Sequence, residues 1–371
     1  MVGRINNQIS EYLQTRIEAN DFPSASYLVA EKGEIVLQDA IGLAVVEPEL
    51  IEAKIDTIYD LASMTKVLVT GLLCARLLEN GVMNLSDKVA KYFVEFNSDE
   101  KCDITIQNLL THTSGLRAWK PLYLAYNLWS GVFDENLDYP INSKVVYSDL
   151  NFILLGFIIE EIYQDNLDNI AAKVIFETLN LQNTFYNPPK ELQKRIAASE
   201  NGNEFEKKTC IEQGYEIRNP QSQFRNRIIW GEVHDGNCYF MNGVSGHAGL
   251  FSTAEETFKI ARQFLPNQTT LLKPETCELF QTNFTPNLNE VRSIAFQLAE
   301  TKDSSAGSAL SKNSFGHLGF TGTSLWIEPE TERIFILLTN RTHEHELPFV
   351  ILNSVRRKFH ELACSELRIY A

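Results

Sequence analysis

Short apolar runs near both ends of the chain have the length and the bounding turn residues of β-strands. Between these runs, apolar residues recur at helical spacing, with polar residues on the other positions. The predicted strands cover residues 25–30, 34–40, 57–61, 314–321, 324–328 and 334–339. The predicted helices cover residues 5–17, 64–80, 105–115, 148–163, 254–264 and 347–362.

The order of these elements predicts how the chain is organised. Strands lie at both ends and helices lie between them, so both ends are expected to join one sheet, with a helical lobe inserted between them. We expect residues 1–62 and 236–371 to form an α/β sheet lobe and residues 63–186 to form the helical lobe. Residues 187–235 are polar and rich in turn residues, and we expect a crossover and loop region there.

Composition and charge narrow the function. The 371 residues are 44% apolar and 22% charged, which is typical of a globular enzyme. The net charge of -15 repels phosphate backbones, so nucleic acid is not an expected partner. The longest apolar run, residues 152–159, is too short for a membrane span. The N-terminus has no signal-peptide pattern and the 6 cysteines form no close pairs, so we expect a cytoplasmic protein with reduced thiols.

Ser63 and Lys66 are the first candidates for chemistry. If the chain is helical from residue 64, the lysine amine lies one turn from the serine hydroxyl and reaches it. A serine hydroxyl needs an adjacent base to become a nucleophile, and a desolvated lysine can act as one. This motif alone is weak, because an N-capping serine followed by a solvated lysine has the same spacing.

Such an enzyme needs a second proton-transfer group and a strand that completes an oxyanion hole. Tyr147, at the start of the most apolar helix, is the candidate for proton transfer, and His317 lies on the predicted strand 314–321. His112 lies where a helix ends, and we expect it to bond local carbonyls rather than to catalyse. The glycine-dense segment 243–253, which contains His247, suits a close approach of backbone to a ligand or to a neighbouring strand.

Together these motifs resemble the serine β-lactamase and penicillin-binding-protein superfamily. The segments around Ser63 and Tyr147, with residues 109–116, 246–253 and 316–323, are most similar to its class C β-lactamase branch, including esterases and penicillin-binding-protein-4B-like members. The resemblance implies an antiparallel β-sheet flanked by helices beside an all-helical lobe, with the site in the cleft between them. It also implies Ser63 as the acylated nucleophile, Lys66 as its base and Tyr147 as the proton relay, with the N–H groups of Ser63 and Phe320 as the oxyanion hole.

Two departures from that pattern bear on the substrate. Asp149 stands where the branch usually has asparagine, and its charge is expected to raise the pKa of Lys66 and weaken it as a base near neutrality. His317 replaces a lysine and is expected to be mostly neutral at pH 7, which favours neutral substrates. We expect Asp149, His317 and Gly319 to contact the substrate, and His247 either to do so from the cleft rim or to serve in packing.

The expected function is a serine hydrolase that acts through an acyl-enzyme on small ester, amide or peptide substrates. A β-lactamase or D-alanyl-D-alanine carboxypeptidase is the alternative within the same superfamily. A ligand sensor or scaffold without catalysis is the alternative from another class. Residues 343–346 and 234–235 contain metal-ligand types but lack a spaced third ligand, so no metal and no cofactor is predicted. The sequence leaves the physiological substrate and the oligomeric state open.

Overall fold

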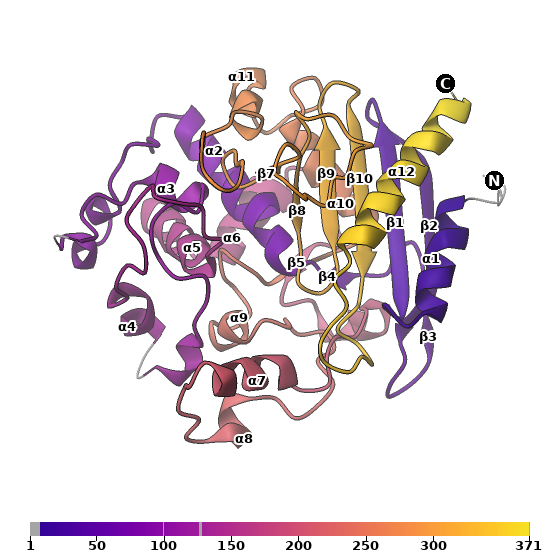
Figure 1. Ribbon diagram of the computed structural model, residues 1–371, viewed down its shortest axis with the longest axis horizontal. Coiled ribbons are helices and arrows are strands. Elements are labelled where there is room, and N and C mark those ends of the chain that lie inside the picture. The colour runs from indigo at the N-terminus through magenta and orange to yellow at the C-terminus, as the bar shows by residue number, and fades with distance from the viewer. Residues whose placement is uncertain (1–7, 99, 126–127, 371) are drawn as a thin grey trace.

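The computed structural model describes residues 8–98, 100–125 and 128–370, and its central feature is a seven-stranded antiparallel sheet (Figure 1). The strands follow the spatial order β3-β2-β1-β10-β9-β8-β7, so the two ends of the chain meet where β1 pairs with β10. The strands of this sheet are β1 (Ser24–Glu31), β2 (Glu34–Val45), β3 (Ile51–Glu52), β7 (Gln297–Leu298), β8 (Phe315–Leu318), β9 (Ser324–Glu328) and β10 (Arg333–Thr339). The predicted fold class and the shared sheet are therefore confirmed.

The alternation of side chains along β1 divides the core into two layers. Tyr27 and Val29 point to the face that carries the N-terminal and C-terminal helices, while Leu28 and Ala30 point to the opposite face and the helical part of the chain. All of these residues are buried, because helices cover both faces. The helices are α1 (Gln8–Glu18), α2 (Leu72–Glu79), α3 (Ile106–Leu110), α4 (Leu128–Phe133), α5 (Asp149–Tyr163), α6 (Leu167–Ala171), α7 (Glu204–Glu212), α8 (Pro220–Gln223), α9 (Gly236–Phe240), α10 (Ala254–Ala261), α11 (Pro274–Cys277) and α12 (Asn353–Tyr370).

A second, three-stranded sheet positions the candidate nucleophile, and the sequence did not predict it. Its order is β4-β6-β5, formed by β4 (Tyr59–Asp60), β5 (Phe185–Tyr186) and β6 (Leu250–Ser252). These strands are short, and each carries too few residues for an alternation pattern to be recognised. The predicted strand at residues 57–61 is thus reduced to β4, which leads directly into Ser63.

The closing helix begins later than predicted. Residues 347–352 are not helical, and α12 starts at Asn353. Pro348 accounts for Leu347 alone, since the residue before a proline is disfavoured in helical geometry, and the sequence pattern does not explain the later start at Asn353. At the other end of the chain, α1 begins at Gln8, and the predicted start at residue 5 lies outside the described residues.

Residues 187–235 contain α7 and α8 between irregular segments, whereas only a crossover and loops were predicted there. The boundaries of the lobes stay a prediction. None of the 6 cysteines, all of which lie in the described ranges, is joined in a disulfide. None of the helices in the described ranges is both long and apolar enough to cross a membrane.

Candidate active site

Ser63 lies in a tight turn between β4 and a helix, as its motif predicts. Ala62 has a left-handed backbone with φ of 46°, which costs a non-glycine residue about 1–2 kcal/mol. The buried carboxylate of Asp60 holds this turn: it accepts hydrogen bonds from the N–H of Ala62 at 2.8 Å and from the N–H of His234 at 2.7 Å. A 3₁₀ turn (Ala62–Met64) and a π-helical turn (Lys66–Gly71) then precede α2. Such π-turns are frequent at functional sites.

Lys66 is fully buried and its amine is held by three groups. The Nζ atom lies 2.9 Å from the Ser63 Oγ, 3.0 Å from the backbone oxygen of His247 and 2.7 Å from the Asp149 Oδ1. Burial lowers the pKa of Lys66, but the charge of Asp149, together with the smaller effects of Tyr147 and of hydrogen bonds to both residues, outweighs burial and leaves the pKa raised. The direction agrees with the expectation from the sequence. The amine is therefore charged near neutral pH in the free protein.

Tyr147 lies beside Lys66, with the lysine Nζ 5.0 Å from the centre of its ring. Burial raises the pKa of the Tyr147 hydroxyl, and the charge of Lys66 offsets part of that rise. His112 packs against the other side of the tyrosine, with ring centres 4.6 Å apart. Its Nδ1 accepts a hydrogen bond from the backbone N–H of Ser148 at 3.0 Å. His112 thus orients the tyrosine segment instead of bonding local carbonyls, which corrects the expectation from its place at a helix end.

The turn between β8 and β9 is fixed against the segment that carries Ser63. The Thr321 hydroxyl donates to the backbone oxygen of Asp60 at 2.7 Å, and the Thr323 hydroxyl donates to that of Leu61 at 3.1 Å. Gly319 is required in this contact, because a Cβ atom there would lie 2.0 Å from the Thr323 Oγ1. These contacts bring Phe320 next to Ser63, and both residues line the same two cavities.

His317 is a buried residue of β8 and directly precedes the last residue of that strand, Leu318. Its Nδ1 donates to the backbone oxygen of Leu318 at 2.8 Å, and its Nε2 has no hydrogen-bond partner among the described residues. Burial and the charges of Lys66 and Arg292 hold its pKa well below the usual value of 6.5. His317 is therefore neutral at pH 7, as the sequence led us to expect.

Two cavities meet at Ser63, and Tyr147 and Phe320 also line both of them. The first, of about 310 Å³, is lined by Arg292, Arg341 and Arg356 together with His317 and Gly319, and we call it the arginine pocket. The second, of about 280 Å³, is walled by Trp119, Phe205 and Phe320, with Asp149 at its edge, and we call it the aromatic pocket. Of the arginines and the aromatic walls, only Phe320 was named from the sequence, and then for its backbone N–H group.

Two arginines of the arginine pocket, Arg341 and Arg356, form no ion pair with a described carboxylate, whereas Arg292 pairs with Glu290 at 2.7 Å. Arg341 donates to the backbone oxygens of Phe320 and Val350, both at 2.7 Å, and Arg356 donates to the backbone oxygen of Thr323 at 3.2 Å. Burial and the neighbouring charge of Arg341 lower the pKa of Arg356 to about 9. Burial also lowers the pKa of Arg341, to about 10. A bound anion would raise the pKa of both arginines again, because it favours their charged forms.

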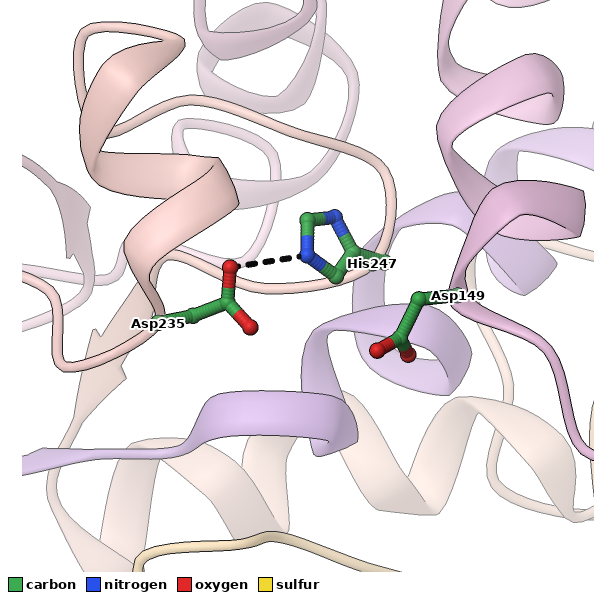
Figure 2. Close-up of side chains that lie close together, drawn as sticks. All are labelled: Asp149, Asp235 and His247. Carbon is green, nitrogen blue, oxygen red and sulfur yellow. Dashed lines mark hydrogen bonds and ion pairs between the residues drawn. The ribbon is translucent and has the colours of Figure 1, made fainter. Parts of the chain in front are cut away.

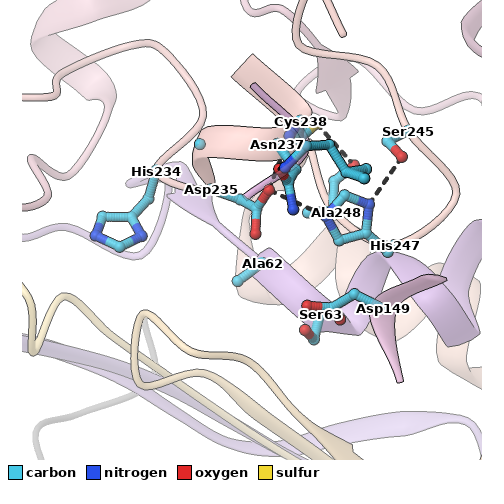
Figure 3. Close-up of polar contacts among 12 residues, drawn as sticks. Ala62, Ser63, Asp149, His234, Asp235, Asn237, Cys238, Ser245, His247 and Ala248 are labelled. Atoms are coloured by element: carbon cyan, nitrogen blue, oxygen red, sulfur yellow. Dashed lines mark hydrogen bonds and ion pairs between the residues drawn. The ribbon is translucent and has the colours of Figure 1, made fainter. Parts of the chain in front are cut away.

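His247 belongs to the surroundings of Lys66, since its side chain is 1% exposed and lines neither cavity. Its ring is held between Ser245 at 2.8 Å and the Asp235 Oδ1 at 3.0 Å (Figure 3). This geometry supports the packing role and not the contact with substrate from the cleft rim. Gly246 allows the loop before His247 to pack closely against α5, because a Cβ atom at position 246 would lie 2.1 Å from the backbone oxygen of Phe152.

Asp149, Asp235 and His247 are the described residues best placed to hold a cation, with ligand atoms within 4.8 Å of one another (Figure 2). The ammonium group of Lys66 already supplies a positive charge at Asp149. Two of the other metal-ligand types found in the sequence, His343 and His234, are used in structure: His343 bonds the backbone of Ser199 and of Val46. His234 pairs with Glu200 at 2.8 Å.

Comparisons with known proteins bear on the fold and on the family of this chain. A protein of Escherichia coli (strain K12) named "Putative D-alanyl-D-alanine carboxypeptidase" is 29% identical over 369 residues, covering 91% of this chain and 82% of the relative. The structure of EstCE1, "a hydrolase with promiscuous acyltransferase activity", superposes with a TM-score of 0.72 at 17% identity, covering 96% of this chain and 97% of that one. A class C β-lactamase from Rhodobacter sphaeroides superposes with a TM-score of 0.71 at 17% identity, covering 98% and 99%.

These two structures share the fold with this protein. The sequence pattern of the Beta-lactamase family matches residues 9–352, which span the shared sheet, Ser63, Lys66 and Tyr147. The chain therefore belongs to the β-lactamase family.

Proposed function

We propose that this protein is a serine hydrolase that cleaves small ester or amide substrates through an acyl-enzyme on Ser63. The observation that carries the proposal is the buried Lys66 amine, 2.9 Å from the Ser63 Oγ and beside the Tyr147 ring. A serine, a buried lysine and a buried tyrosine in contact supply the nucleophile and the proton-transfer groups that acyl transfer requires. A sensor or scaffold has no use for such a buried charged group.

In the proposed reaction the Ser63 oxygen attacks the substrate carbonyl carbon while its proton passes to the neutral form of Lys66, which later returns a proton to Tyr147 once Tyr147 has protonated the leaving group. The N–H groups of Ser63 and Phe320 stabilise the oxyanion. Tyr147 then protonates the leaving group as the bond to it breaks. Water, losing a proton to the same groups, attacks the acyl-enzyme and releases the acid. Because Asp149 keeps Lys66 protonated, the reaction is expected to become faster as the pH rises above neutrality.

Intact-protein mass spectrometry tests this proposal directly. The protein is mixed with p-nitrophenyl acetate and, separately, with a penicillin, and Ser63→Ala is the control. We expect an acyl adduct and release of nitrophenol with the ester, both lost in the variant. A wild-type protein that forms no adduct and releases no nitrophenol would instead support the sensor or scaffold function.

The arginine pocket favours a second candidate, a carboxypeptidase of D-alanyl-D-alanine peptides. The sequence argument for neutral substrates rested on His317 alone, which is indeed neutral. Arg341, just after β10, and Arg356, on α12, however, bring positive charge to the same cavity. A substrate with a carboxylate on its leaving group would satisfy both arginines. The name of the Escherichia coli relative points to the same substrate class.

A pair of substrates distinguishes this candidate: an N-acyl-D-alanyl-D-alanine peptide and the same peptide with a C-terminal amide. We expect the free carboxylate to be preferred, and Arg356→Gln to remove the preference mainly through KM. Arg357→Gln is the matched control, because Arg357 lies next along α12 but bonds the backbone of Ser304 outside the pocket. Equal rates for the two peptides would rule out recognition of the carboxylate.

A further inference from the structure

The aromatic pocket bears on the part of the substrate that the arginines do not reach. Ser63 and Phe320 line both cavities, so a carbonyl group bound at Ser63 has one substituent in each. The proposed function places an anionic leaving group among the arginines. The remaining substituent, which is the acyl group, then faces the aromatic pocket.

The bulkiest walls of this pocket are aromatic and come from distant segments, and the polar side chains of Thr209 and Gln213 lie beside them. The ring centre of Phe205, on α7, lies 4.9 Å from that of Phe320 in the β8–β9 turn. It lies 5.6 Å from the ring centre of Phe349, which does not line the pocket. Trp119 lies on another side, and Ala62 and Ala248 contribute methyl groups. Apolar walls of this kind favour an apolar group over a hydrated one.

Three carboxylates also border the pocket, and each one is already held by the protein. Asp149 pairs with Lys66 at 2.7 Å. Asp235 pairs with His247 at 3.0 Å and accepts from the N–H of Cys238 at 2.8 Å.

Glu206 completes the set. It accepts from the N–H of Gly236 at 2.7 Å and from the Tyr123 hydroxyl at 2.8 Å. Burial and the charge of Asp235 raise the pKa of Glu206 to about 7, so part of its population is neutral near that pH. The three carboxylates are thus bonded to the surrounding protein, and the surface that the pocket offers to a ligand is mainly apolar.

We propose that the aromatic pocket binds a small apolar acyl group, with Phe205 limiting its length. This inference rests on the proposed function. With the arginine pocket, it defines the substrate class as an apolar N-acyl amino acid or its ester analogue, an acylated hydroxy acid. The volume of about 280 Å³ is at the lower end of the range for ligand pockets, which suits a short chain or one ring.

A series of p-nitrophenyl esters tests the acyl side alone, because the leaving group is constant. The central comparison is between the butanoate and the β-alaninate, whose acyl groups have the same number of heavy atoms and differ by a methyl against an ammonium. We expect kcat/KM to be larger for the butanoate by about ten-fold or more. We also expect kcat/KM to rise from acetate to butanoate and to fall for decanoate.

Phe205→Ala is expected to move the preferred chain length upward and to lower kcat/KM for the butanoate by about ten-fold. Phe349→Ala is the matched control, since Phe349 touches the Phe205 ring but does not line the pocket, and its chain-length preference should be that of the wild type.

Faster turnover of the β-alaninate would overturn the inference in favour of a cationic acyl group, while the hydrolase function stood. A Phe205→Ala variant that keeps the wild-type chain-length preference would also overturn the inference about the aromatic pocket. A wild-type protein that forms no acyl adduct with any ester would overturn the hydrolase function as well.

Discussion

The Asp149–Lys66 ion pair allows the clearest test of the mechanism, by the replacement Asp149→Asn. At 2.7 Å and an effective dielectric constant of about 20, the attraction between the two charges is about 6 kcal/mol. Burial of Lys66 opposes this attraction, and opposite charges at such distances shift a pKa by about 1–3 units in practice. The asparagine keeps the size and the hydrogen-bonding oxygen of the side chain but removes its charge.

The sign of the expected effect follows from the raised pKa of Lys66. In the wild type, the fraction of neutral lysine increases as the pH rises toward that pKa, so kcat/KM increases with pH. Removal of the Asp149 charge lowers the pKa, and the ascending limb should move by about 1–3 pH units toward acid. The assay is kcat/KM for p-nitrophenyl acetate measured from pH 6 to pH 10, with the spontaneous hydrolysis subtracted.

Asp165→Asn is the matched control, because it removes an aspartate that pairs with Lys173 at the same distance of 2.7 Å but on the surface. Its profile should coincide with that of the wild type. If the ascending limb of Asp149→Asn does not move, or moves toward alkaline pH, Lys66 is not the base whose ionisation limits the rate. The proton would then leave Ser63 by another route.

Two further predictions concern the β8–β9 turn and the sheet. Gly319→Ala should lower kcat by about 10²–10³-fold with little change in KM, because a Cβ atom 2.5 Å from the Leu61 oxygen displaces the Phe320 N–H. Steady-state kinetics on the folded variant measures this effect. An unchanged kcat would show that the Phe320 N–H is not part of the oxyanion hole. Burial lowers the pKa of His360 to about 4, whereas the pKa in the unfolded chain is about 6.5. As the pH drops from 6.5 toward 4, only the unfolded chain takes up this proton, so the free energy of unfolding should fall by up to about 3 kcal/mol. Urea unfolding at both pH values measures the fall, which His360→Asn should reduce, and an equal fall in the variant would contradict the assignment.

The local part of the site was predictable because its geometry is local. Ser63 and Lys66 are one helical turn apart, and helical spacing alone brings the amine to the hydroxyl. The raised pKa of Lys66 followed from the charge at position 149. The shared sheet followed from the strand patterns at the two ends of the chain, since β1, β2, β9 and β10 are long enough to show their period, whereas the two-residue strands β3 and β7 were not predicted.

The pockets were not predictable, because their residues converge from distant segments without a common pattern. Arg292, Arg341 and Arg356 lie before β7, after β10 and on α12, and no spacing links them. Phe205 lies in the stretch where turn residues obscured α7. His112 was assigned a local role because its partner, the N–H of Ser148, is far away in the sequence. Long-range contacts of this kind are set by packing and not by local preference.

The hydroxyls of Thr321 and Thr323, which tie the β8–β9 turn to the Ser63 segment, also make enzyme activity a reporter of complete folding. The two segments are joined only after more than two hundred intervening residues have been placed, as the bond from Thr321 to Asp60 spans 261 positions. Contacts of such sequence separation form slowly. During refolding, helical signal should therefore recover before turnover does. A newly made chain would stay inactive until its last strands have joined the sheet.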